Sequence, residues 1–375
     1  MSMELTKCKL GEVVTLLNGR AYLMPELQDS GKYRILRVGN LSGGNDSWYY
    51  SDMELDDNKY CESGDLLYAW ACNFGPHIWK EEKVIFHYHI WKLVVDKKKI
   101  NKFFLYYYLL HQTPFYLGGV NGATMVHITK KNMEKKTIYI PCSLETQHHI
   151  ASILSTYDSL IENNTKRIRI LEKMAENLYK EWFVRFRFPG HENVKMVNGL
   201  PNGWKKGALS DVCEFKRGKN ITSSEMKDGA IPVISAGITP SGFHSHANVY
   251  GISITMSSSG ANAGYIAVHY SDIWAADCSY IEEASTPYIY YVYELLNNIR
   301  SIINNFQRGA AQPHVYPRDI NRIKMIIPSE DIRKKANEKI GVIHCQINNL
   351  QRQNSLLARQ RDLLLPRLMS GKLEV

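Results

Sequence analysis

Two pairs of histidines are the side chains whose type and spacing most suggest metal chemistry. His87 and His89 (HYH) stand two residues apart in a strand-like run, and His244 and His246 repeat that spacing (HSH). Because alternate residues of a strand point to the same face, each pair would present two imidazoles together. A zinc site would need further ligands at suitable spacing. We therefore interpret both pairs as ordinary histidines on the polar face of a strand and expect no metal site.

Two further patterns resemble catalytic motifs without matching them. The serines at 257–259 precede Gly260 but do not form the G-x-S-x-G elbow of a serine nucleophile. The Gly-Lys pairs at 31–32, 218–219 and 371–372 lack the G-x-x-x-x-G-K-[S/T] context that cradles a phosphate. We interpret the serines as a simple turn or a loop that contacts nucleic acid, and we expect no catalytic or cofactor-binding residues in the chain.

Basic, amide and hydroxyl side chains are the remaining candidates. The formal net charge is +9 and the pI is about 9.0, which is compatible with a polyanionic partner. Lysine and arginine suit phosphates, whereas arginine, lysine, asparagine, glutamine and serine on loops suit base edges. For each single residue, an ordinary solvated position is the alternative. The candidate DNA contacts are Arg20, Thr124, His127, Lys130, Lys131, Arg217, Lys219, Ser258, Asn262, Arg308, Gln312, His314 and Arg318.

An internal repeat positions most of these candidates. Residues 10–19 (LGEVVTLLNG) match residues 209–218 (LSDVCEFKRG), and residues 127–141 (HITKKNMEKKTIYIP) match residues 314–328 (HVYPRDINRIKMIIP). Between these frames, both copies show short β-prone runs and one helix-like segment. The interiors differ, as expected for two unlike targets and also for surface loops that have drifted.

A heptad pattern follows each copy. Apolar residues recur at alternating spacings of three and four, which is typical of a coiled-coil seam. Asn164 and Asn354 lie within the two seams and resemble polar residues that fix register. Because the linker between the copies is short, the two helices bury their seams only by running antiparallel. The seam residues, which we also expect to serve subunit docking, are Ile150, Leu154, Tyr157, Ile161, Asn164, Ile168, Leu171, Leu178, Trp182, Ile340, Ile343, Ile347, Leu350, Asn354, Leu357 and Leu364.

Seven cysteines without C-x-x-C spacing favour free thiols, and no apolar run is long enough for a signal peptide or a membrane helix. We therefore expect a cytoplasmic protein.

The internal repeat and the heptad patterns divide the chain into five predicted parts. The predicted parts are a first domain at 1–143, a helix at 144–188, a linker at 189–203, a second domain at 204–329 and a helix at 330–375.

Two stretches resemble one known family. IPCSLETQHHIASILSTYDSLIENNTKRIRILEKMAENLYKEWFVRF (140–186) is similar to the central helix of the specificity subunits of type I restriction–modification systems, and LLPRLMSGKLEV (364–375) to their C-terminal end. With the repeated frames, the resemblance covers essentially the whole chain. It implies an α+β fold with a pseudo-two-fold internal repeat, in which two similar α/β target recognition domains are joined by two long antiparallel coiled-coil helices.

The resemblance also implies a function and partners. Each domain would recognise one half of a bipartite, asymmetric DNA target, and the helices would set the spacing and dock two modification (methyltransferase) subunits. S-adenosylmethionine and ATP would belong to the modification and restriction subunits, not to this chain. The sequence agrees, because it lacks the (N/D)PP(Y/F) tetrapeptide with which an adenine methyltransferase holds its base. The alternatives are a non-enzymatic scaffold without DNA sequence preference and a stand-alone nuclease with an irregular site.

Overall fold

The structure is a computed structural model that describes residues 4–41, 47–71, 74–117, 128–309 and 313–373. The chain forms two compact units. Unit 1 consists of Met1–Glu162 with Asn354–Val375, and unit 2 of Asn163–Gln353. Each long helix therefore contributes one segment to each unit. Within the described ranges, no helix combines the length and apolar character that crossing a membrane requires.

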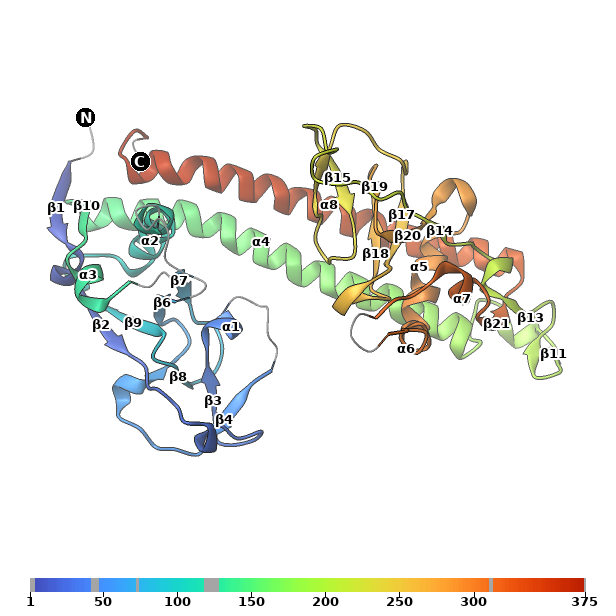
Figure 1. Cartoon of the computed structure of the whole chain (residues 1–375), viewed down its shortest axis with the longest axis horizontal. Coiled ribbons are helices and arrows are strands. Elements are labelled where there is room, and N and C mark those ends of the chain that lie inside the picture. The colour runs from blue at the N-terminus through green and yellow to red at the C-terminus, as the bar shows by residue number, and fades with distance from the viewer. Residues whose placement is uncertain (1–3, 42–46, 72–73, 118–127, 310–312, 374–375) are drawn as a thin grey trace. The chain divides into compact units, whose positions relative to one another are not determined.

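Unit 1 contains one two-stranded and two four-stranded sheets (Figure 1). The pair is β1-β10, and the larger sheets have the orders β2-β9-β6-β7 and β4-β3-β8-β5, in which only the β3-β8 pairing is parallel. The strands are β1 Leu5–Lys9, β2 Val14–Asn18, β3 Tyr33–Leu36, β4 Tyr49–Ser51, β5 Tyr60–Cys61, β6 Leu66–Ala69, β7 Gly75–Ile78, β8 Val84–Phe86, β9 Ile90–Val95 and β10 Thr137–Pro141. The helices are α1 Val38–Leu41, α2 Lys102–Leu117 and α3 Lys130–Glu134, with 3-10 turns η1 Leu10–Glu12, η2 Met24–Glu26 and η3 Asp57–Lys59.

Unit 2 repeats this plan with the same strand order, except that its described strands include no counterpart of β5. Its pair is β13-β21, its four-stranded sheet has the order β14-β20-β17-β18, and its three-stranded sheet has the order β16-β15-β19 with a parallel β15-β19 pairing. The strands are β13 Lys205–Ala208, β14 Lys216–Arg217, β15 Ile231–Ile234, β16 Gly242–His244, β17 Ser253–Ser257, β18 Ile266–His269, β19 Trp274–Ala275, β20 Cys278–Glu282 and β21 Lys324–Ile327. The helices are α5 Ile289–Asn298, α6 Arg300–Asn304 and α7 Pro317–Asn321, with 3-10 turns η6 Leu209–Asp211, η7 Gly260–Asn262 and η8 Glu283–Ser285.

The matched sequence frames have the same structural roles in both units. Leu10 and Leu209 begin η1 and η6, are fully buried, and donate their backbone N–H groups to the carbonyl oxygens of Lys136 and Ile323. A burial requirement and a backbone hydrogen bond thus explain the same leucine in each copy. The predicted internal repeat of two mixed α/β domains is confirmed.

The long helices are α4 (Leu144–Tyr179), which continues as one π-helical turn over Lys180–Val184, and α8 (Glu330–Met369). Within unit 1, the start of α4 and the end of α8 share one apolar core that includes Leu154 and Leu368. Within unit 2, the end of α4 and the start of α8 share another apolar core, which includes Tyr179 and Ile340, and nearer the middle of both helices the Asn164 amide donates to Gln353 Oε1 at 3.4 Å. In each unit the early part of one helix therefore meets the late part of the other. This antiparallel packing confirms the predicted pair of long helices.

Every seam residue predicted from the sequence is buried or half-buried in its unit. The seam side chains therefore stabilise the helix pair, and a docking partner would have to contact other faces of the helices. In unit 1, one polar cluster lies among the apolar contacts. The Arg361 guanidinium donates to Asp158 at 2.5 Å, and Asp158 also accepts a hydrogen bond of 2.6 Å from the Tyr107 hydroxyl.

The segment after α4 joins the core of unit 2. It contains the 3-10 turn η5 (His191–Asn193) and a small hairpin of β11 (Met196–Val197) and β12 (Leu200–Pro201). The Trp204 ring lies 5.3 Å from the Phe188 ring and 6.0 Å from the Phe183 ring, and Phe183 packs edge-on against Tyr291. This aromatic cluster fixes the end of α4 against the domain that follows it. The predicted domain boundaries stay a prediction.

Candidate nucleic-acid interface

In unit 2, backbone hydrogen bonds bring the loop after β17 together with the residues around Arg308 and His314, which lie much later in the chain. Arg308 and His314 exchange two hydrogen bonds (2.9 and 2.8 Å). The residues beside His314 pair with the loop after β17, because Gly260 N–H donates to the Pro313 carbonyl and Val315 N–H to the Ser258 carbonyl, both at 3.0 Å. We name these residues (258–260, Arg308 and 313–315), together with the side chains beside them (Arg217, Asp277 and Asp319), the unit 2 corner.

The unit 2 corner contains two arginines, and each of them lies beside a different carboxylate. The Ser259 hydroxyl donates to Asp277 Oδ2 at 2.6 Å, and Arg217 Nη2 lies 3.6 Å from Asp277 Oδ1. Arg308 pairs with the largely buried carboxylate of Asp319 at 2.9 Å, although 61% of its own side chain is exposed. An arginine that is anchored at one side and exposed at the other is suited to bind a phosphate or a guanine edge.

The other candidates of unit 2 differ in accessibility. Lys219 and Arg318 are exposed, and Asn262 is half-buried in η7. Ser258 is only 3% exposed, and its hydroxyl lies 3.4 Å from that of Ser279, so it supports the corner from beneath. Because its side chain is buried, Ser258 is not available for a direct contact with DNA. Gln312 lies outside the described residues.

The corresponding corner of unit 1 lies at the connection between β8 and β9. The sequence run 84–95 suggested a continuous strand with His87 and His89 on one face, and this interpretation was wrong. His87 forms a β-bridge with Arg20, and Tyr88 and His89 form the turn between two strands, which is closed by Ile90 N–H donating to the His87 carbonyl at 3.0 Å. The turn makes the chain reverse within three residues.

Aromatic rings cover this turn. Trp70, which directly follows β6, donates its indole N–H to the Tyr88 carbonyl at 2.8 Å, and its ring lies edge-on to His89 at 5.1 Å. The rings of His87 and His89 are 4.8 Å apart, and Tyr88 lies 4.0 Å from His89. We name Trp70, His87, Tyr88 and His89 the unit 1 corner.

Burial and neighbouring charges keep the imidazoles of this corner neutral. Burial, the nearby His89 and Arg37 lower the pKa of His87 to about 4, and burial also lowers the pKa of His89. At neutral pH, His87 therefore carries no positive charge, and because its Nδ1 accepts the His89 backbone N–H at 3.4 Å, its Nε2–H is left as a donor. Such a surface is suited to bases and sugars rather than phosphates. No three metal-ligating side chains gather anywhere in the portion of the chain that the structure describes.

The remaining candidates of unit 1 do not form one cluster. Arg20 is bound by both oxygens of Glu26 (2.7 and 3.2 Å), which raises its pKa and leaves its guanidinium in an intramolecular ion pair. Lys130 and Lys131 are exposed on α3, where Lys130 lies 3.8 Å from Glu134. Thr124 and His127 lie outside the described residues.

The two corners occupy the same place in the topology. The last residues of β6 and β17 pair with Ile90 and Cys278, and these residues accept backbone hydrogen bonds from Gly19 and Gly218. The connection before that position is His87–Tyr88–His89 in unit 1 and Ala276–Asp277 in unit 2. Sequence reasoning missed Asp277 and the turn at 87–89. The pairing of Gly19 with Gly218 was the signal that could have located both.

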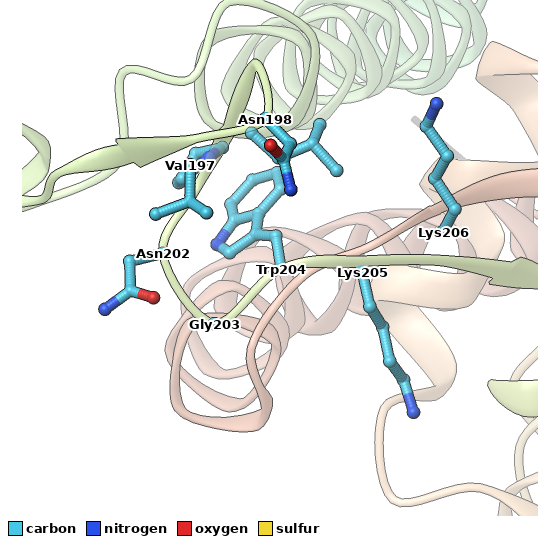
Figure 2. A pocket seen from close by; sticks show the side chains of 9 residues that line it. Val197, Asn198, Asn202, Gly203, Trp204, Lys205 and Lys206 are labelled. Carbon is cyan, nitrogen blue, oxygen red and sulfur yellow. The ribbon is translucent and has the colours of Figure 1, made fainter.

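A shallow pocket of about 390 Å³ lies elsewhere in unit 2, around the hairpin and Trp204. Figure 2 shows Lys205 and Lys206 extending in opposite directions from neighbouring positions at its edge. Its lining provides ammonium and amide groups but no carboxylate, thiol or imidazole. Because the pocket lacks a titratable pair for acid–base chemistry, the two corners remain the better candidates for a functional site.

Comparison with known proteins agrees with this geometry. The family model of the type I restriction modification DNA specificity domain matches residues 3–173 and 201–356. The chain is 28% identical over 313 residues to the type I restriction enzyme MjaIX specificity subunit of Methanocaldococcus jannaschii, covering 75% of this chain and 71% of that one. It is 22% identical over 369 residues to a putative type I specificity subunit of Mycoplasma pneumoniae, covering 97% and 95%. Its fold is similar to the crystal structure of a type I restriction–modification S subunit from M. genitalium, with a TM-score of 0.63, 19% identity and coverage of 98% and 96%.

Proposed function

The chain belongs to the family of type I restriction–modification DNA specificity subunits, and on that premise we propose that it selects the DNA sequence on which its complex acts. It would recognise a bipartite, asymmetric target in double-stranded DNA, one half with each domain. It would carry out no catalysis itself. The recognition domains would extend over residues 1–143 and 204–329, followed by the helices at 144–188 and 330–375 with a linker at 189–203.

One observation carries this proposal: the same corner of the same topology bears different chemistry in the two units. Unit 1 presents neutral imidazoles and aromatic rings, and unit 2 presents two arginines that each lie beside a carboxylate. Base edges in the major groove differ in their donors, acceptors and methyl groups, so unlike side chains select unlike bases. A protein that bound only phosphates would need basic groups in both corners.

The faces of the long helices outside the seam support a role in docking. Large apolar side chains are exposed there, and a protein partner could cover them. They are Leu160, Leu356 and Leu363 in unit 1, and Ile170, Met174 and Val342 in unit 2. We propose that these faces bind two modification subunits, which carry S-adenosylmethionine and through which ATP-dependent restriction subunits join the complex.

A binding selection tests the proposal. The chain, together with its modification subunits, is incubated with random duplexes, and the bound fraction is amplified and sequenced over several rounds. We expect two enriched clusters of bases separated by an unselected spacer. Equal binding to random and selected duplexes would favour a scaffold without sequence recognition. Cleavage of DNA by the purified chain with magnesium alone would instead identify a nuclease.

A further inference from the structure

The carboxylate of Asp277 is unexpected in the unit 2 corner, because a negative charge in a DNA interface is repelled by phosphates. We propose that Asp277 is a specificity-determining residue that accepts a hydrogen bond from an exocyclic amino group, that of cytosine or adenine, in the half-site recognised by unit 2. This inference rests on the proposed function, because it requires that the corner faces DNA.

The geometry holds one carboxylate oxygen and leaves the other accessible. Oδ2 accepts the Ser259 hydroxyl at 2.6 Å, and Oδ1 lies 3.6 Å from Arg217 Nη2, which is beyond the usual length of a direct hydrogen bond. The Asp277 side chain is 35% exposed. Because an ionised carboxylate provides about four lone-pair positions, Asp277 keeps acceptor capacity that these contacts do not use.

The chemistry of DNA then limits the partner of Asp277. A carboxylate cannot pair with phosphate oxygens, with guanine O6 or with thymine O4, because all of these are acceptors. The amino groups of cytosine and adenine are the donors that the major groove presents, and aspartate is an established partner of the cytosine amino group. Arg217 beside the carboxylate offsets its charge and can bind a neighbouring phosphate or guanine.

The corner of unit 1 provides an internal comparison. Its turn carries His87, Tyr88 and His89 at the position where unit 2 carries Ala276 and Asp277. A neutral imidazole can both donate and accept, so it does not impose the same requirement for an amino group. Substitution of Asp277 should therefore change the preference at one position in one half-site only.

The experiment measures methylation rates of duplexes by the complete complex with its modification subunits. The panel varies one position at a time around the motif of the wild-type chain. Asp277→Asn replaces a pure acceptor by a group that also donates. Asp228→Asn, a matched control, neutralises an exposed carboxylate of the same unit outside the corner. Ser259→Ala keeps Asp277 and removes only the hydroxyl that orients it.

We expect the wild-type complex to favour an amino-bearing base about 10-fold or more at one position, corresponding to about 1.4 kcal/mol or more of discrimination. Asp277→Asn should reduce this ratio to about 3-fold or less, or shift it toward guanine or thymine, with the other half-site unchanged. Ser259→Ala should weaken the ratio several-fold, and Asp228→Asn should leave it intact.

Two results would overturn the inference. If Asp277→Asn folds normally and keeps every base preference of the wild type, Asp277 does not determine specificity. If Asp277→Asn does not fold, an unchanged preference in Ser259→Ala would be equally decisive. A wild-type complex without any base preference is distinguishable from both, because it would refute the proposed function itself.

Discussion

Replacing Gly218 by alanine should distort the unit 2 corner through a single added methyl group. Gly218 has an ordinary backbone conformation, so glycine is required there by space and not by a positive φ angle. A Cβ atom at this position would lie 2.4 Å from the Ala276 carbonyl oxygen and 2.6 Å from that of Ala275. Gly19 makes the same close approach to the Phe86 carbonyl oxygen, at 2.3 Å.

The cost follows from these distances. Real Cβ contacts stay beyond 3.0 Å, so the backbone that leads to Asp277 would have to retreat by roughly 0.6 Å. Overpacking against backbone costs about 3 kcal/mol, at the upper end of the usual range. For a unit of this size, that loss lowers the melting temperature by about 10 °C.

The assay compares thermal unfolding of the wild type, Gly218→Ala and Gly237→Ala. Gly237 also lies in a loop of unit 2, but its nearest neighbour, the Thr239 carbonyl oxygen, would be 3.3 Å from an added Cβ. We expect Gly237→Ala to stay within about 1 kcal/mol of the wild type. Equal melting temperatures for both variants would refute the reasoning that Gly218 lies in direct contact with the backbone of Ala275 and Ala276.

The remaining predictions concern the helix pair and pH. Arg361→Met should destabilise unit 1 by about 1–3 kcal/mol because the Asp158 carboxylate loses its cation. A double-mutant cycle with Asp158→Asn, measured by urea unfolding, should show that the two substitutions are coupled in their effect on the free energy of unfolding. Additive effects would contradict the contact. Burial lowers the pKa of His269 to about 4, and its Nε2 lies 2.8 Å from the Thr255 hydroxyl. Because the unfolded state takes up this proton at a higher pH, the contribution is present above pH about 6.5 and lost as pH falls toward 4, by up to about 3 kcal/mol. His269→Gln should flatten that part of the stability–pH curve, and an unchanged curve would assign it to other groups.

The repeat and the helices could be predicted from the sequence because they depend on periodic patterns and frames that local sequence determines. The aromatic segments at 103–108 and 288–293 belong to the helix-like segments of the two copies, and aromatic residues at helical spacing are usually part of the core; Phe104, Tyr107 and Tyr291 are buried. Predicting these features does not require knowing which residues that are far apart in the sequence lie in contact.

The details of the corners could not be predicted because they depend on contacts between residues that are far apart in the sequence. The run 84–95 is β-prone on both sides of the two histidines, so its pattern did not mark the turn at 87–89. Arg20 matched a basic position of the other copy, but its ion pair with Glu26 followed from no pattern. No sequence pattern indicated Asp277, and its approach to the candidate Arg217 and its hydrogen bond from Ser259 become visible only in the fold.

The central claim is that two similar units of one chain recognise two unlike halves of a DNA target. Mapping N6-methyladenine across the genome of cells that carry this chain with its modification subunits tests it most directly. The account predicts one bipartite, asymmetric motif with an unspecified spacer and one methylated adenine in each half, on opposite strands. A single uninterrupted motif, or methylation without any motif, would contradict it.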